Sequence, residues 1–546
     1  MDARPDDWWR GAVFYQIYIR SFADSNNDGI GDIAGITRKL DYLNDGTPSS
    51  LGVDALWLTP VFSSPDHDWG YDISDYRSIH RDFGSMDDFD RLVEECHRRG
   101  IKVIIDMVLN HTSIEHPWFQ ESRSSRDNPR RDWYIWRDGR APGKPPNRWK
   151  AVVEGSAWQY DQVTGQYYYH AFLEEQPDLN WRNPEVRRAM LDNCRFWLDR
   201  GIDGFRLDLV NFLHEDEQLR DNPRRIGLRG YDMQKHLYDR SQQEDHEVLR
   251  ELRGMLDERP GTMMVGEVVA DSPEEVVRYL GSGSDELHLS FLLAFGMGWW
   301  SAGRFRRLVE AMERLVPEAG WPCYHLSNHD VPRHFSRLGK FGDAEARARA
   351  AAVMLLTLRG TAFLYYGEEI GMPSGKVPRR MLRDPVGIRF WPLPVGRDSC
   401  RTPMPWGTGL HASFSEAEPW LPVDASSGIK NVALQQEDPG SLMNFYRQLI
   451  RLRREVPALH RGDYRTVTGC PGRVFAFLRE ANGVRVAVYI NFSSRVVSCR
   501  EQPLPRAGHW EVLLSSRDDR CPGATTFPVE LKASEALVIR ETQGGL

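Results

Sequence analysis

Short, continuous runs of apolar residues recur through residues 1–470, and stretches with helical periodicity lie between them. Such runs are typical of parallel β-strands that are buried on both faces. We predict eight strands, at Ala12–Tyr18, Val53–Leu58, Lys102–Met107, Gly204–Asp208, Met263–Glu267, Glu286–Ser290, Cys323–Ser327 and Ala362–Tyr365.

The intervening stretches carry apolar residues at helical spacing. Asn183 and Pro184 stand where a helix would have its N-cap and its first residue. Eight strand-then-helix units favour an α/β chain that closes into a (β/α)8 barrel over an open sheet. The predicted helices are Met86–Arg99, Pro184–Asp199, Glu247–Asp257, Ala302–Leu315, Ala344–Leu358 and Leu442–Arg454.

Two long insertions and a late change of pattern divide the chain. We assign residues 1–107 and 184–461 to the barrel and residues 108–183, rich in Trp, Tyr, Pro and Gly, to an inserted subdomain. A second insertion, residues 369–428, follows the last strand. Beyond residue 462 the pattern changes to that of β-strands, which predicts an all-β C-terminal domain, residues 462–546. The predicted strands of this domain are Val474–Leu478, Val484–Asn491 and Ala536–Arg540.

Composition narrows the class of protein. The net charge is -8 and both signs are interspersed, so no basic surface for nucleic acid is expected. There is no apolar run long enough for a membrane span and no apolar core of a signal peptide near the N-terminus. Seven scattered cysteines without a CxxC pair argue against a disulfide framework or structural zinc, and they favour a cytoplasmic location.

The chain contains 18 tryptophans. They could fill a large core, or they could stack on the apolar faces of sugar rings. Composition leaves both interpretations open.

Three carboxylates stand at the carboxyl ends of predicted strands. Asp208 ends the fourth strand, Glu267 ends the fifth, and Asp330 follows the seventh. In a barrel these ends form the rim that carries active sites. Carboxylates on adjacent strands can approach to about 5–5.5 Å, the separation used in retaining glycoside hydrolysis. One such carboxylate alone would suggest an ion pair at the rim of the barrel. The prediction of glycoside hydrolysis therefore depends on all three carboxylates together.

Retaining hydrolysis needs one ionised and one protonated carboxyl group. Arg206 precedes Asp208 by two residues, so both side chains point to the same face of the strand. We expect this cation to lower the pKa of Asp208. The apolar neighbours Val265 and Val268 should raise the pKa of Glu267.

Other polar residues follow the same strand ends. Asp106 and His111 close the third strand, and His329 precedes Asp330; they suit sugar hydroxyls or support of Arg206. The segment Asp68–Asp72 follows the second strand and joins a carboxylate to an aromatic ring, a pair that suits a glucose ring as well as a surface turn.

The segment Asp24–Asp32 has the alternating oxygen ligands of a cation-binding loop. Gly29 permits the sharp turn, but Gly35 stands where an EF-hand requires Glu. We predict a structural Ca²⁺ or Mg²⁺ and no organic cofactor; an acidic solvated turn is the alternative. The candidate ligands are Asp24, Asn26, Asp28, Ile30 through its carbonyl, and Asp32.

Together these segments resemble the α-amylase family of glycoside hydrolases over essentially the whole chain. The four signature segments of the family are matched, in order, by Asp106–His111, Gly204–Asn211, Gly266–Glu267 and His325–Asp330.

The resemblance implies that Asp208 is the nucleophile, Glu267 the general acid/base and Asp330 the stabiliser of the transition state. It implies further sugar contacts from an arginine in the eighth loop, for which Arg397 is preferred to Arg401. The remaining candidate sugar-binding residues are Asp68, Tyr71, His111, Phe172, Arg206 and His329.

The segment Gln176–Asn180 resembles the signature of the oligo-1,6-glucosidase-like subgroup. This implies an exo-acting, retaining α-glucosidase on small α-glucosides, with Asp68 closing the pocket. Transfer of glucose to another acceptor is the alternative on the same site. A third alternative, a non-enzymatic partner of a membrane transporter, conflicts with the complete carboxylate set. Leu209, after the nucleophile, leaves the linkage preference open, and a monomer and a homodimer are equally compatible with the sequence.

Overall fold

The computed structural model describes residues 7–153, 155–393, 395–499, 509–517, 523–525 and 529–542. Eight parallel strands form one sheet in the order β11-β10-β9-β5-β2-β1-β13-β12. The end strands β11 and β12 lie side by side, and the Cys323 thiol donates to the Ser290 carbonyl at 3.2 Å, so the sheet curls into a barrel. The strands are β1 (Val13–Ile17), β2 (Ala55–Leu58), β5 (Lys102–Val108), β9 (Gly204–Asp208), β10 (Met263–Glu267), β11 (Leu289–Phe291), β12 (Cys323–His325) and β13 (Thr361–Tyr365).

Burial explains why the apolar runs form these strands. Every residue of the eight strands is buried except Lys102 at the start of β5. Helices cover the outer side and strand side chains fill the inside, so neither face contacts water. All eight predicted strands and the barrel are confirmed; the sixth strand begins at Leu289 instead of Glu286.

The six predicted helices are also confirmed. The Asn183 side chain accepts a hydrogen bond from the backbone N–H of Glu185 at 2.8 Å, which caps α5 as the sequence predicts. The helices are α3 (Met86–Arg98), α5 (Pro184–Asp199), α6 (Asp245–Asp257), α9 (Ala302–Leu315), α11 (Ala344–Thr357) and α14 (Leu442–Glu455).

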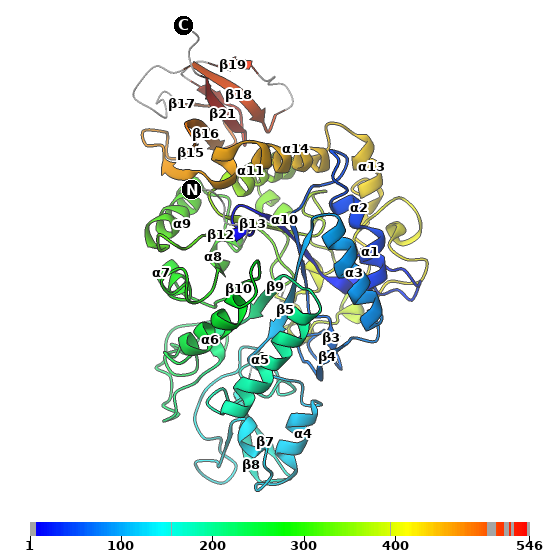
Figure 1. Cartoon of the computed structure of the whole chain (residues 1–546), viewed down its shortest axis with the longest axis vertical. Helices are drawn as coiled ribbons and strands as arrows, with labels where there is room; N and C mark the ends of the chain where they lie inside the picture. Colours follow the sequence, from blue (N-terminus) through cyan, green and yellow to red (C-terminus); the bar gives the residue numbers. More distant parts are fainter. Residues whose placement is uncertain are drawn as a thin grey trace.

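The segment between β5 and α5 has its own secondary structure, with helix α4 (Pro117–Ser124) and an antiparallel sheet of order β6-β8-β7. In Figure 1 it lies at the opposite end of the molecule from the C-terminal strands. The sheet strands are β6 (Trp136–Arg137), β7 (Trp158–Asp161) and β8 (Gln166–Tyr169).

The C-terminal part is all-β, as predicted. A six-stranded sheet and the two-stranded sheet of β17 (Val497–Cys499) and β20 (Val529–Leu531) enclose a second apolar core. Cys521 lies outside the described residues. The strands of the larger sheet are β14 (Asp463–Thr466), β15 (Val474–Ala481), β16 (Val484–Asn491), β18 (His509–Ser515), β19 (Gly523–Thr525) and β21 (Ala536–Thr542).

Most of the tryptophans are buried in these cores, which decides the open question of their use in favour of core filling. Among the described cysteines, Cys96, Cys194, Cys323, Cys400 and Cys499 are free thiols. No helix in the described part of the chain is both long and apolar enough to cross a lipid bilayer.

Gly204, the first residue of β9, is essential to the barrel's packing. Its φ is +149°, and a Cβ atom there would lie 1.9 Å from the carbonyl oxygen of Met263 on β10. We predict that Gly204→Ala lowers the free energy of unfolding by about 2–5 kcal/mol, through overpacking and backbone strain. Gly254→Ala in α6, where a Cβ would meet nothing within 4 Å, is the control and should raise it by about 0.5–1 kcal/mol. Equal urea denaturation midpoints for the two variants would contradict this account.

Candidate active site

Arg206 is the centre of the polar cluster at the carboxyl end of the barrel. Its guanidinium donates to Asp208 at 2.7 Å and also contacts Asp106 and Glu267. The three carboxylates come from the neighbouring strands β5, β9 and β10, and all four side chains are buried. The strand ends therefore bring together Asp208 and Glu267, as the sequence predicts, and Asp106 does support Arg206.

One cation serves three buried carboxyl groups in this cluster. Burial raises the pKa of Glu267 to about 7, against which Arg206 acts by its charge. Burial also raises the pKa of Asp208, and Arg206 offsets only part of this rise. The raised pKa of Glu267 is confirmed, whereas the expected lowering of the Asp208 pKa is wrong because desolvation outweighs the adjacent cation.

The pKa of Asp106 is raised by burial too. Because the three groups share Arg206, their protonation belongs to the set instead of to one residue. Burial and the single shared cation thus favour a protonated carboxyl group in this cluster, which a general acid requires.

Asp330 has the opposite electrostatic environment. It contacts Arg401 at 2.9 Å and His329 Nε2 at 3.2 Å, and Arg397 Nη1 lies 3.6 Å away. Although burial acts in the other direction, these neighbours lower the pKa of Asp330 below its ordinary value. The site therefore combines an ionised carboxylate with a cluster that retains a proton.

His329 is a neutral hydrogen-bonding residue. Burial lowers its pKa to about 3. The Gln16 amide donates to Nδ1 at 2.7 Å, so the ring proton is on Nε2, which faces Asp330 and lies 2.6 Å from the Tyr71 hydroxyl. The Tyr71 hydroxyl also donates to Asp106 at 3.0 Å, so it joins the two sides of the site.

A second group of residues gathers around Asp68. Its carboxylate contacts Arg397, and the Gln176 amide lies 3.3 Å from it. The same amide nitrogen lies 3.0 Å from His111 Nε2, and the His111 ring is 5.4 Å from the ring of Phe172. The predicted residues Asp68, Arg397, His111 and Phe172 are thus connected through Gln176. We call this connected group of five residues the wall around Asp68.

The side chains of the two arginines in the eighth loop differ in their exposure to solvent. The Arg401 side chain is 0% exposed and its Nε donates to the His329 carbonyl at 2.9 Å, so it lies beneath Asp330. Arg397 is 18% exposed and contacts Asp68 and Asp384. Arg397 is therefore the more accessible of the two, and it stays the preferred candidate for a sugar contact.

Sequence reasoning missed several residues of the site. Asp384 accepts hydrogen bonds from Arg397 at 2.7 Å and Gln16 orients His329, yet neither follows a pattern at a predicted strand end. Trp57 donates to Asp106 at 3.1 Å from inside β2, where it counted only as an apolar residue. The signal available for Gln176 was its place in the Gln176–Asn180 segment.

The Asp24–Asp32 loop follows β1 and turns as predicted, with φ of +88° at Gly29. Asp24 accepts from the backbone N–H groups of Asn27 and Gly29 at 2.7 and 2.8 Å, and Asp32 caps helix α1 (Ile33–Arg38). The five candidate ligands of the loop offer only carboxylate, amide and carbonyl oxygens, and such oxygens suit a hard cation such as Ca²⁺ or Mg²⁺.

Comparison with known proteins agrees with this geometry. Residues 16–462 match the family model of the alpha-amylase catalytic domain. The chain is 44% identical over 517 residues to a probable alpha-glucosidase of Rhizobium meliloti, covering 92% of each protein. It is 40% identical to an oligo-1,6-glucosidase of Parageobacillus thermoglucosidasius, over 89% of this chain and 91% of the relative.

Solved structures share the whole fold. An alpha-glucosyl transfer enzyme superposes with a TM-score of 0.90 at 43% identity, covering 98% of this chain and 99% of that one. The trehalulose synthase of Pseudomonas mesoacidophila superposes with a TM-score of 0.88 at 35% identity, with the same coverage.

The raised pKa of Glu267 predicts how the stability of the protein depends on pH. Between the ordinary glutamate pKa and about pH 7, Glu267 is protonated in the folded protein and ionised in the unfolded chain. The folded state therefore binds the extra proton, and the free energy of unfolding falls as pH rises through this window. Glu267→Gln removes this loss. Its melting temperature relative to the unmodified protein should therefore rise between pH 5 and pH 7.5.

Glu94→Gln, on the exposed face of α3, is the control and should keep a constant difference in melting temperature. A constant difference for Glu267→Gln as well would contradict the assigned proton.

Proposed function

Because the chain belongs to the alpha-amylase family of glycoside hydrolases, we propose that it is a retaining, exo-acting α-glucosidase that releases terminal non-reducing glucose from small α-glucosides. The observation that carries this proposal is the shared contact of Asp208 and Glu267 with Arg206. Both carboxyl groups touch one guanidinium, so they lie close enough for a double displacement.

In the first step Asp208 attacks the anomeric carbon while Glu267 gives its proton to the departing glycosidic oxygen. The bond from carbon to that oxygen breaks as the glucosyl ester of Asp208 forms. In the second step Glu267 takes a proton from water, and the water oxygen displaces Asp208 with net retention. Binding of substrate leaves the shared proton on Glu267 and Asp208 ionised.

Asp330 and its neighbours stabilise the positive charge that develops on the sugar ring. Asp330 stays ionised through the whole cycle because Arg397, Arg401 and His329 lower its pKa. It does not compete for the proton that Glu267 transfers, so the acid and the stabiliser remain distinct.

The wall around Asp68 supports exo action. Asp68 and Arg397 form an ion pair, and Gln176 and His111 extend it. A glucose ring seated against Asp208 would have its non-reducing hydroxyls directed at this wall, where a longer chain could not continue. His111 and Phe172 contact the same ring from the side.

Transfer of glucose to a sugar or alcohol is the second candidate, because relatives of both kinds share the fold. The two activities share the glucosyl–enzyme intermediate and differ in the acceptor that reaches it. The ratio of free glucose to transferred product from maltose separates them.

Leu209 follows the nucleophile in a left-handed conformation, with φ of 45° and ψ of 52°. This conformation is costly for a branched residue, and the half-buried Leu209 packs against the same apolar cluster as Phe172. Maltose and isomaltose compared as substrates identify the linkage that this side chain permits.

We also assign a structural Ca²⁺ or Mg²⁺ to the loop after β1. The oxygens that would hold it come from Asp24, Asn26, Asp28, the Ile30 carbonyl and Asp32. Its contribution would be to neutralise the loop's charge and fix the turn, without taking part in catalysis.

The double displacement predicts distinct losses for the two reacting residues. Asp208→Asn should lower kcat by about 10³–10⁵-fold on every substrate, since no covalent intermediate forms. Glu267→Gln should lose comparable activity on maltose but retain more on aryl α-glucosides whose leaving groups need no proton. The unmodified enzyme should release α-glucose first, as followed by NMR. First appearance of β-glucose would exclude retention, and equal losses for Glu267→Gln on both substrates would exclude its acid role.

The ion assignment predicts a chelator-sensitive stability. EDTA should lower the melting temperature, and Ca²⁺ or Mg²⁺ at about 100 times its Kd should restore about 2.7 kcal/mol of stability. Asp24→Ala should show neither response. Asp45→Ala, in an unrelated acidic turn, is the control and should respond as the unmodified protein does. An unmodified protein that is insensitive to both reagents would leave the loop a solvated turn.

A further inference from the structure

We infer that Arg20 is a positioning residue for Asp68, acting through Asp66. The inference rests on the proposed function, in which Asp68 binds the non-reducing end of the substrate. Arg20 lies in the short helix η2 (Ile19–Ser21) after β1, and Asp68 lies in the loop between β3 (Phe62–Ser63) and β4 (Asp75–Ile79). No sequence pattern connects the two residues.

Arg20 contacts residues on both sides of Asp68 in the sequence. Its Nη2 donates to the two carboxylate oxygens of Asp66 at 2.7 and 2.6 Å, and its guanidinium lies 5.4 Å from the centre of the Trp69 ring. Asp66 is two residues before Asp68 and Trp69 is the next residue after it. The Arg20 side chain is 3% exposed, so the paired charges are largely shielded from solvent.

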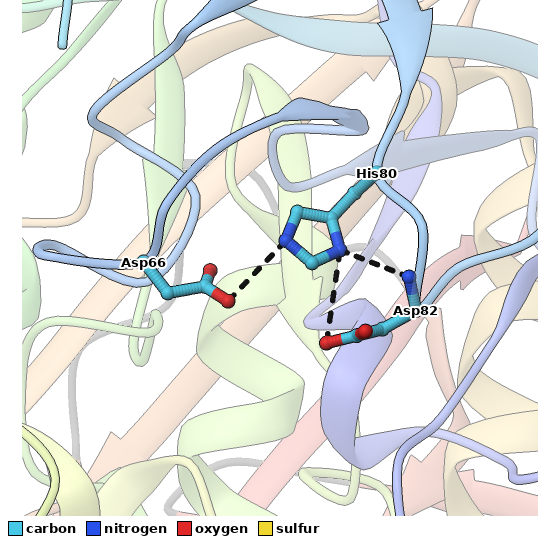
Figure 2. Close-up of side chains that lie close together, drawn as sticks. All are labelled: Asp66, His80 and Asp82. Atoms are coloured by element: carbon cyan, nitrogen blue, oxygen red, sulfur yellow. Dashed lines mark hydrogen bonds and ion pairs between the residues drawn. The ribbon is translucent and has the colours of Figure 1, made fainter. Parts of the chain in front are cut away.

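The cluster extends to His80 and Asp82 (Figure 2). His80 Nε2 lies 3.2 Å from Asp66, and His80 Nδ1 accepts the backbone N–H of Asp82 at 3.1 Å. Arg20 Nη1 donates to Asp82 at 3.1 Å. The fixed strand end at His80 and the helix η2 thus grip Asp66 from two sides. Although burial acts in the opposite direction, His80 and Arg20 lower the pKa of Asp66.

Asp66, His80 and Asp82 also bring three ligand atoms within 4.8 Å of one another, a spacing that would suit a metal ion. Arg20 decides against that use here. Its guanidinium already donates to both oxygens of Asp66 and to Asp82, and a second cation in the same space would be repelled. The Arg20 guanidinium thus supplies the positive charge between Asp66 and Asp82 that a metal ion would otherwise supply.

The loop needs an external support because its backbone is strained. Asp66 and Trp69 have φ of 67° and 53°, conformations that non-glycine residues rarely adopt. Inside the loop, the buried carboxylate of Asp72 accepts from the backbone N–H of Asp68 at 2.8 Å. Asp72 fixes the loop's own curvature, whereas Arg20 connects the Asp66 end of the loop to the helix after β1. Tyr71, at the other end, is held by its hydrogen bond to Asp106 on β5.

The positioning is tested by a double-mutant cycle between Asp66 and Asp68. Asp66→Asn is suitable because asparagine tolerates the left-handed backbone and removes the charge alone. We expect Asp66→Asn to lower kcat/KM on an aryl α-glucoside about 10-fold or more, by displacing Asp68. In the Asp68→Asn background the same substitution should change kcat/KM less than about 2-fold, because residues that act through each other are not additive.

Arg20→Lys, combined with Asp68→Asn in the same way, repeats the cycle from the other partner, since one ammonium group cannot reproduce the two guanidinium nitrogens that hold Asp66 and Asp82. It also decides the question if Asp66→Asn fails to fold. The control is Asp161→Asn, which removes a buried carboxylate paired with Arg123 at 2.8 Å in the inserted segment. It should lower the melting temperature yet leave kcat/KM nearly unchanged in both backgrounds.

The outcomes separate the two proposals. If Asp68→Asn alone leaves kcat/KM unchanged, the assigned substrate contact of Asp68 is wrong. If Asp68→Asn is severe and Asp66→Asn lowers kcat/KM by the same factor in both backgrounds, Asp68 binds substrate but Arg20 and Asp66 do not position it. Loss of the 10-fold effect in the Asp68→Asn background supports the inference.

Discussion

The buried guanidinium of Arg206 is the interaction on which the rest of the site depends. Asp106, Asp208 and Glu267 lie at the ends of three adjacent strands, and without a cation among them their charges could not be buried together. One positive charge for three carboxyl groups leaves the cluster short of full compensation. Burial with one cation for three carboxyl groups therefore favours a protonated carboxyl group in the cluster, as the proposed acid catalysis requires.

Asp330 shows what the same rim does with more cations. Two arginines, Arg397 and Arg401, face a single carboxylate, and the neutral His329 lies beside it, so the pKa of Asp330 falls where that of Glu267 rises. The two carboxyl groups differ both in exposure, with 32% for the Asp330 side chain and 10% for that of Glu267, and in the charges that face them. Their division into a proton donor and a permanently ionised group follows from the arrangement of arginines around the rim.

The fold was predictable because every barrel strand is an almost wholly buried apolar run, and burial on both faces leaves a plain signal in a sequence. The sixth strand begins late because the backbone N–H of Leu287 donates to the Tyr279 carbonyl at 3.1 Å instead of to a neighbouring strand. The preceding Glu286 side chain is held by His246 and Arg250. Residues at strand ends, such as Asp208 and Glu267, could be placed together because adjacent strands end at one rim. Asp384 and Gln16 could not, since their contacts depend on loop paths and packing that leave no periodicity. The sign of the Asp208 pKa shift was missed because a sequence shows neighbouring charges but not desolvation.

The two halves of the substrate site are built with different precision. Asp208 and Glu267 project from strands whose register is fixed by the barrel, and Arg206 between them comes from one of the same strands. Asp68 projects from a strained loop, and a shift of one ångström there would displace the sugar from the nucleophile. Such a loop requires contacts to rigid elements, and the buried Arg20 supplies them from the helix that follows β1. The barrel thus fixes the carboxylates of the strand ends, and ion pairs between loops fix Asp68, to which we assign the terminal sugar of the proposed substrate.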